Sequence, residues 1–72
     1  MEHQLVICIK NKGYEASLEA RKLYESIPDP KAEKYQQIRV IDESGEDYLY
    51  PKELFVAIEL PKTIEEAIFR EA

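Results

Sequence analysis

Residues 39 to 56 constrain the fold of this chain more than any other stretch. Runs of β-branched and aromatic residues flank the acidic segment Asp42-Glu-Ser-Gly45. Asp at the first position of a type I turn and Gly at the fourth, where a left-handed backbone is needed, are typical of a β-hairpin loop. Pro51 follows the second run, and the apolar segment Leu54-Phe-Val56 comes after it. The stretch therefore predicts a hairpin, a 3₁₀ turn over 51–54 and the start of another strand.

The register of this hairpin decides which way its tyrosines point. If residues 43–45 form the loop, with a bulge at the glycine, Val40 opposes Tyr48 and Ile38 opposes Tyr50. These pairs make one wholly apolar face. In this register both tyrosines are expected to belong to the core.

A second register places only residues 44–45 in the loop. Tyr50 then lies opposite Arg39, so that the tyrosines share a face with a cation and are available to a ligand. This register also sets Asp42 directly against Asp47, and like charges in opposite positions destabilise a sheet. Turn chemistry and charge therefore favour the first register.

Apolar, β-branched runs mark the other strands. The run Leu5-Val-Ile-Cys-Ile9 is unbroken and has the length of a strand that is buried on both faces. We expect a mainly β fold with strands over roughly 4–10, 22–27, 37–42, 46–50 and 55–59. Thr63 and the apolar spacing that follows it predict a short C-terminal helix over about 63–70. Because a helix this short is marginal alone, it is expected to dock on the sheet or on a partner.

Residues 15 to 27 are open to two interpretations. Their Ala, Leu, Glu, Arg and Lys residues favour a helix, and apolar residues recur at helical spacing. In the alternative, Leu18 anchors a loop and residues 22–27 form a strand with alternating side chains. Pro28 ends either element. We favour the strand, because the resemblance described below supports it.

Length and charge narrow the class of protein. A chain of 72 residues makes one domain, and such a domain buries only about 60% of the surface that its unfolded form exposes. The formal net charge of −5 repels phosphate backbones, whose binding needs clustered Lys and Arg. Nucleic acid is therefore a poor candidate partner.

Cysteine usage and hydropathy predict the compartment. The single cysteine, Cys8, cannot form an internal disulfide, whereas small secreted domains usually contain several. Leu5 to Ile9 is too short for the apolar region of a signal peptide and far below the ~20 residues of a spanning helix. We expect a single domain over 1–72 that is cytoplasmic and has no membrane segment.

Several blocks of the chain carry a family resemblance. They are Cys8-Ile-Lys-Asn-Lys-Gly-Tyr-Glu-Ala-Ser-Leu18, Arg39-Val-Ile-Asp-Glu-Ser-Gly-Glu-Asp-Tyr-Leu-Tyr-Pro51, Leu54-Phe-Val56 and Ile58-Glu-Leu-Pro61. Together they resemble a family of small bacterial proteins with an SH3-like barrel. The resemblance implies a single small barrel of about five strands. It brings no settled activity with it.

The layout from Gly45 to Val56 is also similar to the end of eukaryotic signalling SH3 domains. In those domains a Gly-containing turn precedes a strand, a proline, a 3₁₀ turn and an aromatic-Val strand, and Tyr50-Pro51 and Phe55-Val56 stand in those places here. The chain has no tryptophan, and Phe55 replaces a tyrosine. It therefore departs from the aromatic groove that grips proline-rich peptides.

The residue types that carry out catalysis or bind metals in other proteins occur in this sequence without the neighbours that such sites need. His3 is the only histidine, and Cys8 lies within an apolar strand where a thiol behaves as a small hydrophobe. The acids of 42–47 lack the spacing of a calcium loop, and the chain has no Gly-rich phosphate loop. We expect no catalytic residue, no metal site and no cofactor.

Tyrosines remain as the candidate binding residues. A tyrosine supplies amphipathic contact area at low entropic cost, although half of the aromatics are expected to fill the core. We expect Tyr14, Tyr24, Tyr50 and Pro51 to bind another protein. The chain would then be a non-catalytic protein-binding module or regulatory subunit, present as a monomer or weak homodimer. The alternatives are a nucleic-acid-associated barrel that uses local lysines and arginines, and a homodimeric structural protein.

Overall fold

The computed structural model describes the backbone of residues 3–71 and their side chains except those of residues 65 and 69–71. Its strands are β1 (Gln4–Cys8), β2 (Leu23–Ile27), β3 (Gln37–Ile41), β4 (Asp47–Pro51) and β5 (Phe55–Ala57). Its helices are α1 (Pro30–Lys34), the 3₁₀ turn η1 (Lys52–Leu54) and α2 (Lys62–Glu71). The predicted fold class is confirmed, with each predicted element found within a few residues of its expected bounds.

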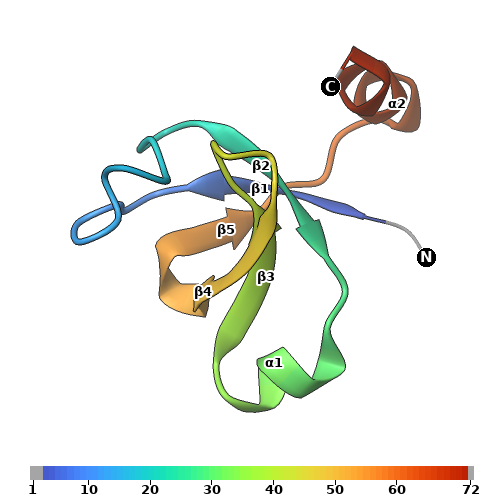
Figure 1. Cartoon of the computed structure of the whole chain (residues 1–72). Coiled ribbons are helices and arrows are strands. Elements are labelled where there is room, and N and C mark those ends of the chain that lie inside the picture. The colour runs from blue at the N-terminus through green and yellow to red at the C-terminus, as the bar shows by residue number, and fades with distance from the viewer. Residues whose placement is uncertain (1–2, 72) are drawn as a thin grey trace.

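The strands form one antiparallel sheet in the order β4-β3-β2-β1-β5. Figure 1 shows how strongly this sheet curls around its inner face. Among the described strands, the edge strands β4 and β5 do not pair with each other, so the sheet makes a half-barrel and not a closed barrel. One side of the inner face therefore stays open.

The segment between β1 and β2 is a folded loop, and the strand interpretation of residues 22–27 is confirmed. Helix propensity is overridden because Leu18 is fully buried and belongs to the core. The N–H groups of Ser17 and Leu18 both donate to the carbonyl of Tyr14 at 2.9 Å, which makes a turn. Arg21 adopts a φ of 67°, which directs the chain into β2 and which no helix accommodates.

The hairpin between β3 and β4 has the favoured register, with Val40 opposite Tyr48 and Ile38 opposite Tyr50. The N–H of Gly45, at a φ of 84°, donates to the carbonyl of Asp42 at 2.9 Å and closes the predicted turn. The expectation that both tyrosines are core is wrong for one of them. Tyr50 is buried, but Tyr48 is 50% exposed.

Tyr48 and Tyr50 differ in burial because only Tyr50 is covered by an aromatic ring from another loop. The ring of Tyr14, from the loop between β1 and β2, packs edge-on against the ring of Tyr50, with 5.3 Å between centroids. Tyr48 lies nearer the hairpin loop and lines a shallow hollow at the surface. Strand register alone therefore does not determine burial in a sheet this small.

The core lies on the inner face of the half-barrel. It comprises Val6, Cys8, Leu18, Tyr24, Val40, Tyr50, Leu54 and Phe55. The prediction that Cys8 belongs to the core is confirmed. The prediction that half of the aromatic residues fill the core is also confirmed for those from Tyr14 to Phe55, since Tyr24, Tyr50 and Phe55 are buried and the other three are exposed. Burial raises the pKa of the Cys8 thiol.

The two α-helices occupy different positions relative to the sheet. In α1, the carboxylate of Asp29 accepts from the N–H of Ala32 at 3.1 Å and caps the helix, which packs beside β3. Figure 1 shows α2 apart from the sheet, at the end of an extended tether. Within the described part of the chain, neither helix reaches the length and apolarity needed to cross a bilayer.

Candidate functional site

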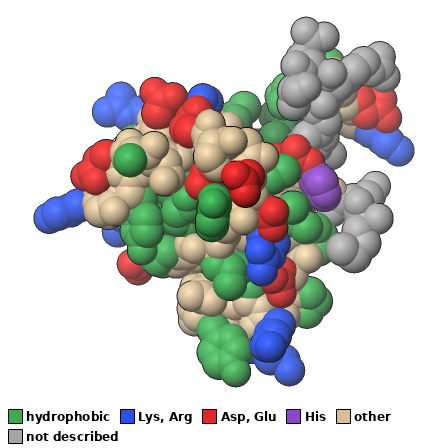
Figure 2. All heavy atoms as spheres, viewed as in Figure 1, with side chains coloured by type: hydrophobic (Ala, Val, Ile, Leu, Met, Phe, Trp, Pro, Cys, Tyr) green, Lys and Arg blue, Asp and Glu red, His purple; other side chains and the backbone are tan. Residues whose placement is uncertain are grey.

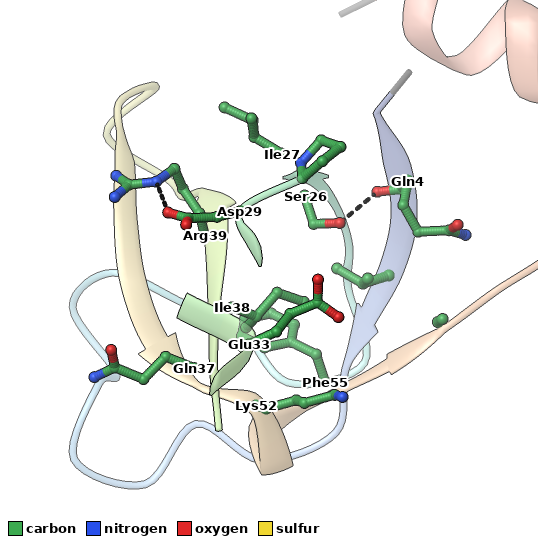
Figure 3. Close-up of a pocket in the computed structure, with 13 residues that line it drawn as sticks. Gln4, Ser26, Ile27, Asp29, Glu33, Gln37, Ile38, Arg39, Lys52 and Phe55 are labelled. Atoms are coloured by element: carbon green, nitrogen blue, oxygen red, sulfur yellow. Dashed lines mark hydrogen bonds and ion pairs between the residues drawn. The ribbon is translucent and has the colours of Figure 1, made fainter. Parts of the chain in front are cut away.

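The open side of the half-barrel contains a hollow of about 320 Å³, called here the barrel mouth. Figure 3 shows it between β1 and β5 on one side and β3 and α1 on the other. Its apolar lining comprises Val6, Ile27, Pro28, Ile38, Phe55 and Ala57. Its polar lining comprises Gln4, Ser26, Asp29, Glu33, Gln37, Arg39 and Lys52. The hollow thus combines an apolar floor with a polar rim, as ligand pockets do.

One wall of the barrel mouth is held by an ion-paired arginine. Arg39 Nε donates to the carboxylate of Asp29 at 2.9 Å, and its Nη1 donates to the carboxylate of Asp47 at 2.9 Å. The N–H of Ala32 and the guanidinium of Arg39 lower the pKa of Asp29. These contacts join the start of α1 to β3 and β4, so this wall is fixed before any ligand arrives.

The rim also carries two exposed charges of opposite sign. Glu33 and Lys52 are both exposed, and neither makes an ion pair with another described side chain. In Figure 3 the carboxylate of Glu33 projects over the hollow, and Lys52 lies below it beside Phe55. A ligand seated on the floor would therefore meet both a carboxylate and an ammonium group.

The four predicted binding residues do not form one site. Tyr24 and Tyr50 are buried, so that a partner cannot reach their ring faces. Tyr14 is 37% exposed and lies against Tyr50. Pro51 is half-buried at the start of η1, beside Gln36. The structure therefore brings Tyr14 and Tyr50 together, and it leaves only Tyr14 and Pro51 available to a partner.

A second, shallower hollow of about 340 Å³ surrounds Tyr14 and Tyr48. It also includes the exposed Leu49, and its floor contains the buried Asp42 and Tyr50. Sequence reasoning missed Tyr48 and Leu49 as surface residues, although their position beside a hairpin loop on an edge strand was a usable signal. It missed the barrel mouth entirely.

The buried tyrosine hydroxyls tie loops to the sheet. The hydroxyl of Tyr24 donates to Glu43 Oε2 at 2.5 Å and accepts from the N–H of Glu19 at 2.7 Å. Burial, followed by the hydrogen bond to Glu43, raises the pKa of Tyr24 to about 12. The hydroxyl of Tyr50 donates to the carboxylate of Asp42. These phenols are therefore protonated near neutral pH and hold the loop between β1 and β2 against the hairpin.

Glu43 is expected to make stability depend on pH in the acid range. Its carboxylate lies 2.6 Å from Lys22 Nζ, and the hydrogen bonds from Lys22 and Tyr24 lower its pKa. A carboxylate with a depressed native pKa stabilises the fold above its unfolded pKa of about 4.3, and this contribution is lost as pH falls through the native value. The advantage of wild type over Glu43→Gln in urea midpoint should therefore shrink between pH 7 and pH values below about 4.

The control for this experiment is Glu53→Gln. Glu53 is exposed and makes no ion pair with a described side chain, so this variant corrects for the loss of one surface carboxylate. A difference between wild type and Glu43→Gln that stays constant from neutral to acid pH would contradict the role assigned to the Lys22–Glu43–Tyr24 network.

Comparison with known proteins leaves the geometry as the main guide to function. No protein-family model, curated protein or solved structure matches the chain. Among residues 3–71, the described side chains include no group of three or more His, Cys, Asp or Glu that could hold a metal ion. The barrel mouth, with its apolar floor and polar rim, is the best-formed candidate site in the described part of the molecule.

Proposed function

We propose that this protein is a non-catalytic protein-binding module that holds a short segment of a partner in the barrel mouth. The observation that supports this most is a hollow of about 320 Å³ with an apolar floor and a polar rim, on the side where the sheet fails to close. Specific ligand sites in proteins are typically ~300–1,000 Å³ and have this combination of surfaces. The size of the mouth suits one or two peptide side chains.

The likeness to SH3-like barrels is part of the same proposal. The strand order, the hairpin and the 3₁₀ turn between β4 and β5 support the family resemblance drawn from the sequence motifs. A bacterial, cytoplasmic regulatory subunit is the biological setting that this resemblance favours. Binding in the barrel mouth would not use the four binding residues expected from the sequence, because Tyr14, Tyr24, Tyr50 and Pro51 do not line the mouth.

The rim chemistry indicates what kind of segment would bind. An apolar side chain would cover Ile38 and Phe55, where little polar surface competes with it. Glu33 would pair with a basic neighbour in the ligand, and Lys52 would pair with an acidic group or a backbone carbonyl. The expected ligand is therefore an extended peptide with an apolar residue beside a charged one.

Dispersed charges on the molecular surface favour a protein partner over nucleic acid. Figure 2 shows lysine and arginine side chains scattered among acidic ones on the visible face. Arg39, which lines the mouth, is already shared between Asp29 and Asp47. A phosphate backbone needs several unpaired cations in a row.

Blocking the mouth is expected to abolish peptide binding. Ala57 lines the mouth and is exposed, so Ala57→Phe fills the hollow without removing a core contact. Peptides selected from a displayed random library on the wild-type protein should bind Ala57→Phe at least about tenfold more weakly, a change of ~1.4 kcal/mol in binding free energy. Isothermal titration calorimetry measures the affinities.

The matched control is Glu53→Phe, which adds the same ring on η1, outside the residues that line the mouth. This variant should bind the selected peptides as wild type does. The proposal is wrong if the library yields no binder, or if the binders tolerate Ala57→Phe. Loss of binding in Tyr48→Ser, but not in Ala57→Phe, would instead place the site in the shallow hollow around Tyr14 and Tyr48.

A further inference from the structure

We infer that the shallow hollow around Tyr14 and Tyr48 binds a quaternary ammonium group, the positively charged head of molecules such as choline and of a trimethylated lysine side chain. This site is separate from the barrel mouth, because no residue lines both hollows. Two features of the shallow hollow support the assignment. Tyrosine rings line it, and its floor contains a buried carboxylate that forms no ion pair with a described side chain.

Three tyrosines line the shallow hollow. Tyr48 and Tyr50 are two residues apart on β4, so they point to the same face of the hairpin. Tyr50 belongs to the floor, whereas Tyr48 is half exposed. The ring plane of Tyr14 makes an angle of 77° with that of Tyr50. Rings that meet nearly at a right angle form a corner, and the faces of tyrosine rings attract cations.

The floor of the hollow carries a negative charge. Asp42 is only 6% exposed, and this burial opposes ionisation, but the hydrogen bonds from Ser44 and Tyr50 outweigh it and lower the pKa of Asp42. The carboxylate is therefore ionised near neutral pH. None of the ion pairs between described side chains includes it. Because a buried charge normally has a partner of opposite charge, this carboxylate favours a cation in the hollow above it.

The hydrogen bonds of Asp42 indicate which kind of cation suits the hollow. Its Oδ1 accepts from both the hydroxyl and the N–H of Ser44, at 2.5 and 2.9 Å, and its Oδ2 accepts from the hydroxyl of Tyr50. A carboxylate has only about four acceptor sites. A primary ammonium or guanidinium group would therefore give up hydrogen bonds to water that Asp42 cannot replace. A quaternary ammonium group has no N–H donor and loses none.

The surroundings of the hollow favour the same class of ligand. Leu49 is 42% exposed and offers apolar contact to the methyl groups of the ligand. Glu46, on the hairpin loop, is exposed and makes no ion pair with a described side chain. The formal net charge of the chain is −5. This negative field attracts a simple cation and disfavours a ligand that carries an anionic group beside its ammonium.

Titration of the full chain with choline chloride at constant ionic strength tests this inference. Nuclear magnetic resonance of the backbone amides should show saturable shifts at Tyr14, Ser44 and Tyr48. The matched control ligand is the neutral alcohol that has a tert-butyl group in place of the trimethylammonium group. It has the shape of choline without the charge, so it should bind at least about fivefold more weakly.

A second pair of ligands identifies the source of the cation. A short peptide that contains trimethyllysine should bind more tightly than the same peptide with unmodified lysine, since only the modified side chain lacks N–H donors. If the trimethyllysine peptide also binds more tightly than choline, the natural ligand is a modified protein. If choline binds more tightly than this peptide, the natural ligand is a free small cation.

Variants locate the binding in the hollow. Tyr48→Leu removes an exposed ring but keeps apolar bulk, and it should weaken choline binding at least about threefold. Asp42→Asn removes the charge and should weaken binding at least about fivefold, with urea unfolding to show that the variant is folded. Tyr35→Leu is the matched control and should bind as wild type does, since Tyr35 is exposed at the end of α1 and does not line this hollow.

The outcomes also separate this site from the barrel mouth. Ala57→Phe, which fills the mouth, should leave choline binding unchanged, so the two proposals can fail separately. Absence of saturable shifts around Tyr48 on addition of choline would overturn the inference. Equal affinity for choline and its neutral analogue would also overturn it, as would choline binding that survives Tyr48→Leu unchanged.

Discussion

Replacing Leu18 with alanine is expected to lower the free energy of unfolding by about 2–5 kcal/mol. Leu18 is fully buried and carries the loop between β1 and β2 into the core. Its carbonyl also accepts a hydrogen bond from Asn11 Nδ2 at 3.0 Å, so the loop is tied down at the same point. A domain this short has on the order of 3–5 kcal/mol of stability in total. The expected loss is therefore comparable to the whole stability, and the variant should be marginally stable or unfolded at room temperature.

Urea unfolding followed by circular dichroism measures this loss. The matched control is Leu49→Ala, which removes the same atoms from an exposed position on β4 and should cost only about 0.5 kcal/mol. If Leu18→Ala were as stable as Leu49→Ala, the loop between β1 and β2 would not belong to the cooperative core. Its folding would then have to be treated separately from that of the sheet.

Asp42→Ala is expected to destabilise the protein by about 1–3 kcal/mol, because it leaves a buried hydroxyl without a partner. The carboxylate of Asp42 is buried and accepts from the hydroxyl of Tyr50, from Ser44 Oγ at 2.5 Å and from the Ser44 N–H at 2.9 Å. Burial opposes ionisation, but these hydrogen bonds outweigh it and lower the pKa of Asp42. The same residue thus holds the hairpin turn and the ring of Tyr50.

A double-mutant cycle with Tyr50→Phe isolates the contact between these two residues. The double variant should cost less than the sum of the two single variants, since removing both partners leaves no orphaned hydroxyl. Urea midpoints of all four proteins give the coupling. Strict additivity would mean that the contact contributes nothing. Tyr50→Ala is unsuitable as a probe of binding, because Tyr50 is buried and its truncation would disturb the core.

Local chemistry made the hairpin predictable. Asp42 and Gly45 fix the turn, and the register follows from avoiding like-charge pairs across the strands. Residues 15–27 were harder, because their composition favours a helix and only the burial of Leu18 decides against it. Here a tertiary contact outweighs a propensity that amounts to a few tenths of a kcal/mol per residue.

The barrel mouth could not be predicted, because its residues come from segments far apart in the chain. Val6, Glu33, Ile38, Lys52 and Ala57 meet only because the sheet curls and its edge strands stay apart. Neither the curl of the sheet nor the separation of its edge strands can be predicted from a local sequence pattern. The contrast between Tyr48 and Tyr50 has the same origin, since the covering ring of Tyr14 belongs to a different part of the chain.

The burial of Cys8 gives this protein an internal reporter of its own opening. The only thiol in the sequence is fully buried at the end of β1, which lies between β2 and the edge strand β5. A thiol reagent can modify it only when the surrounding core separates, because reaction requires an accessible thiolate. The rate at which Cys8 is labelled under native conditions therefore reports how often the core around it opens. Variants throughout the sheet can be ranked by this rate without denaturant and without an added probe.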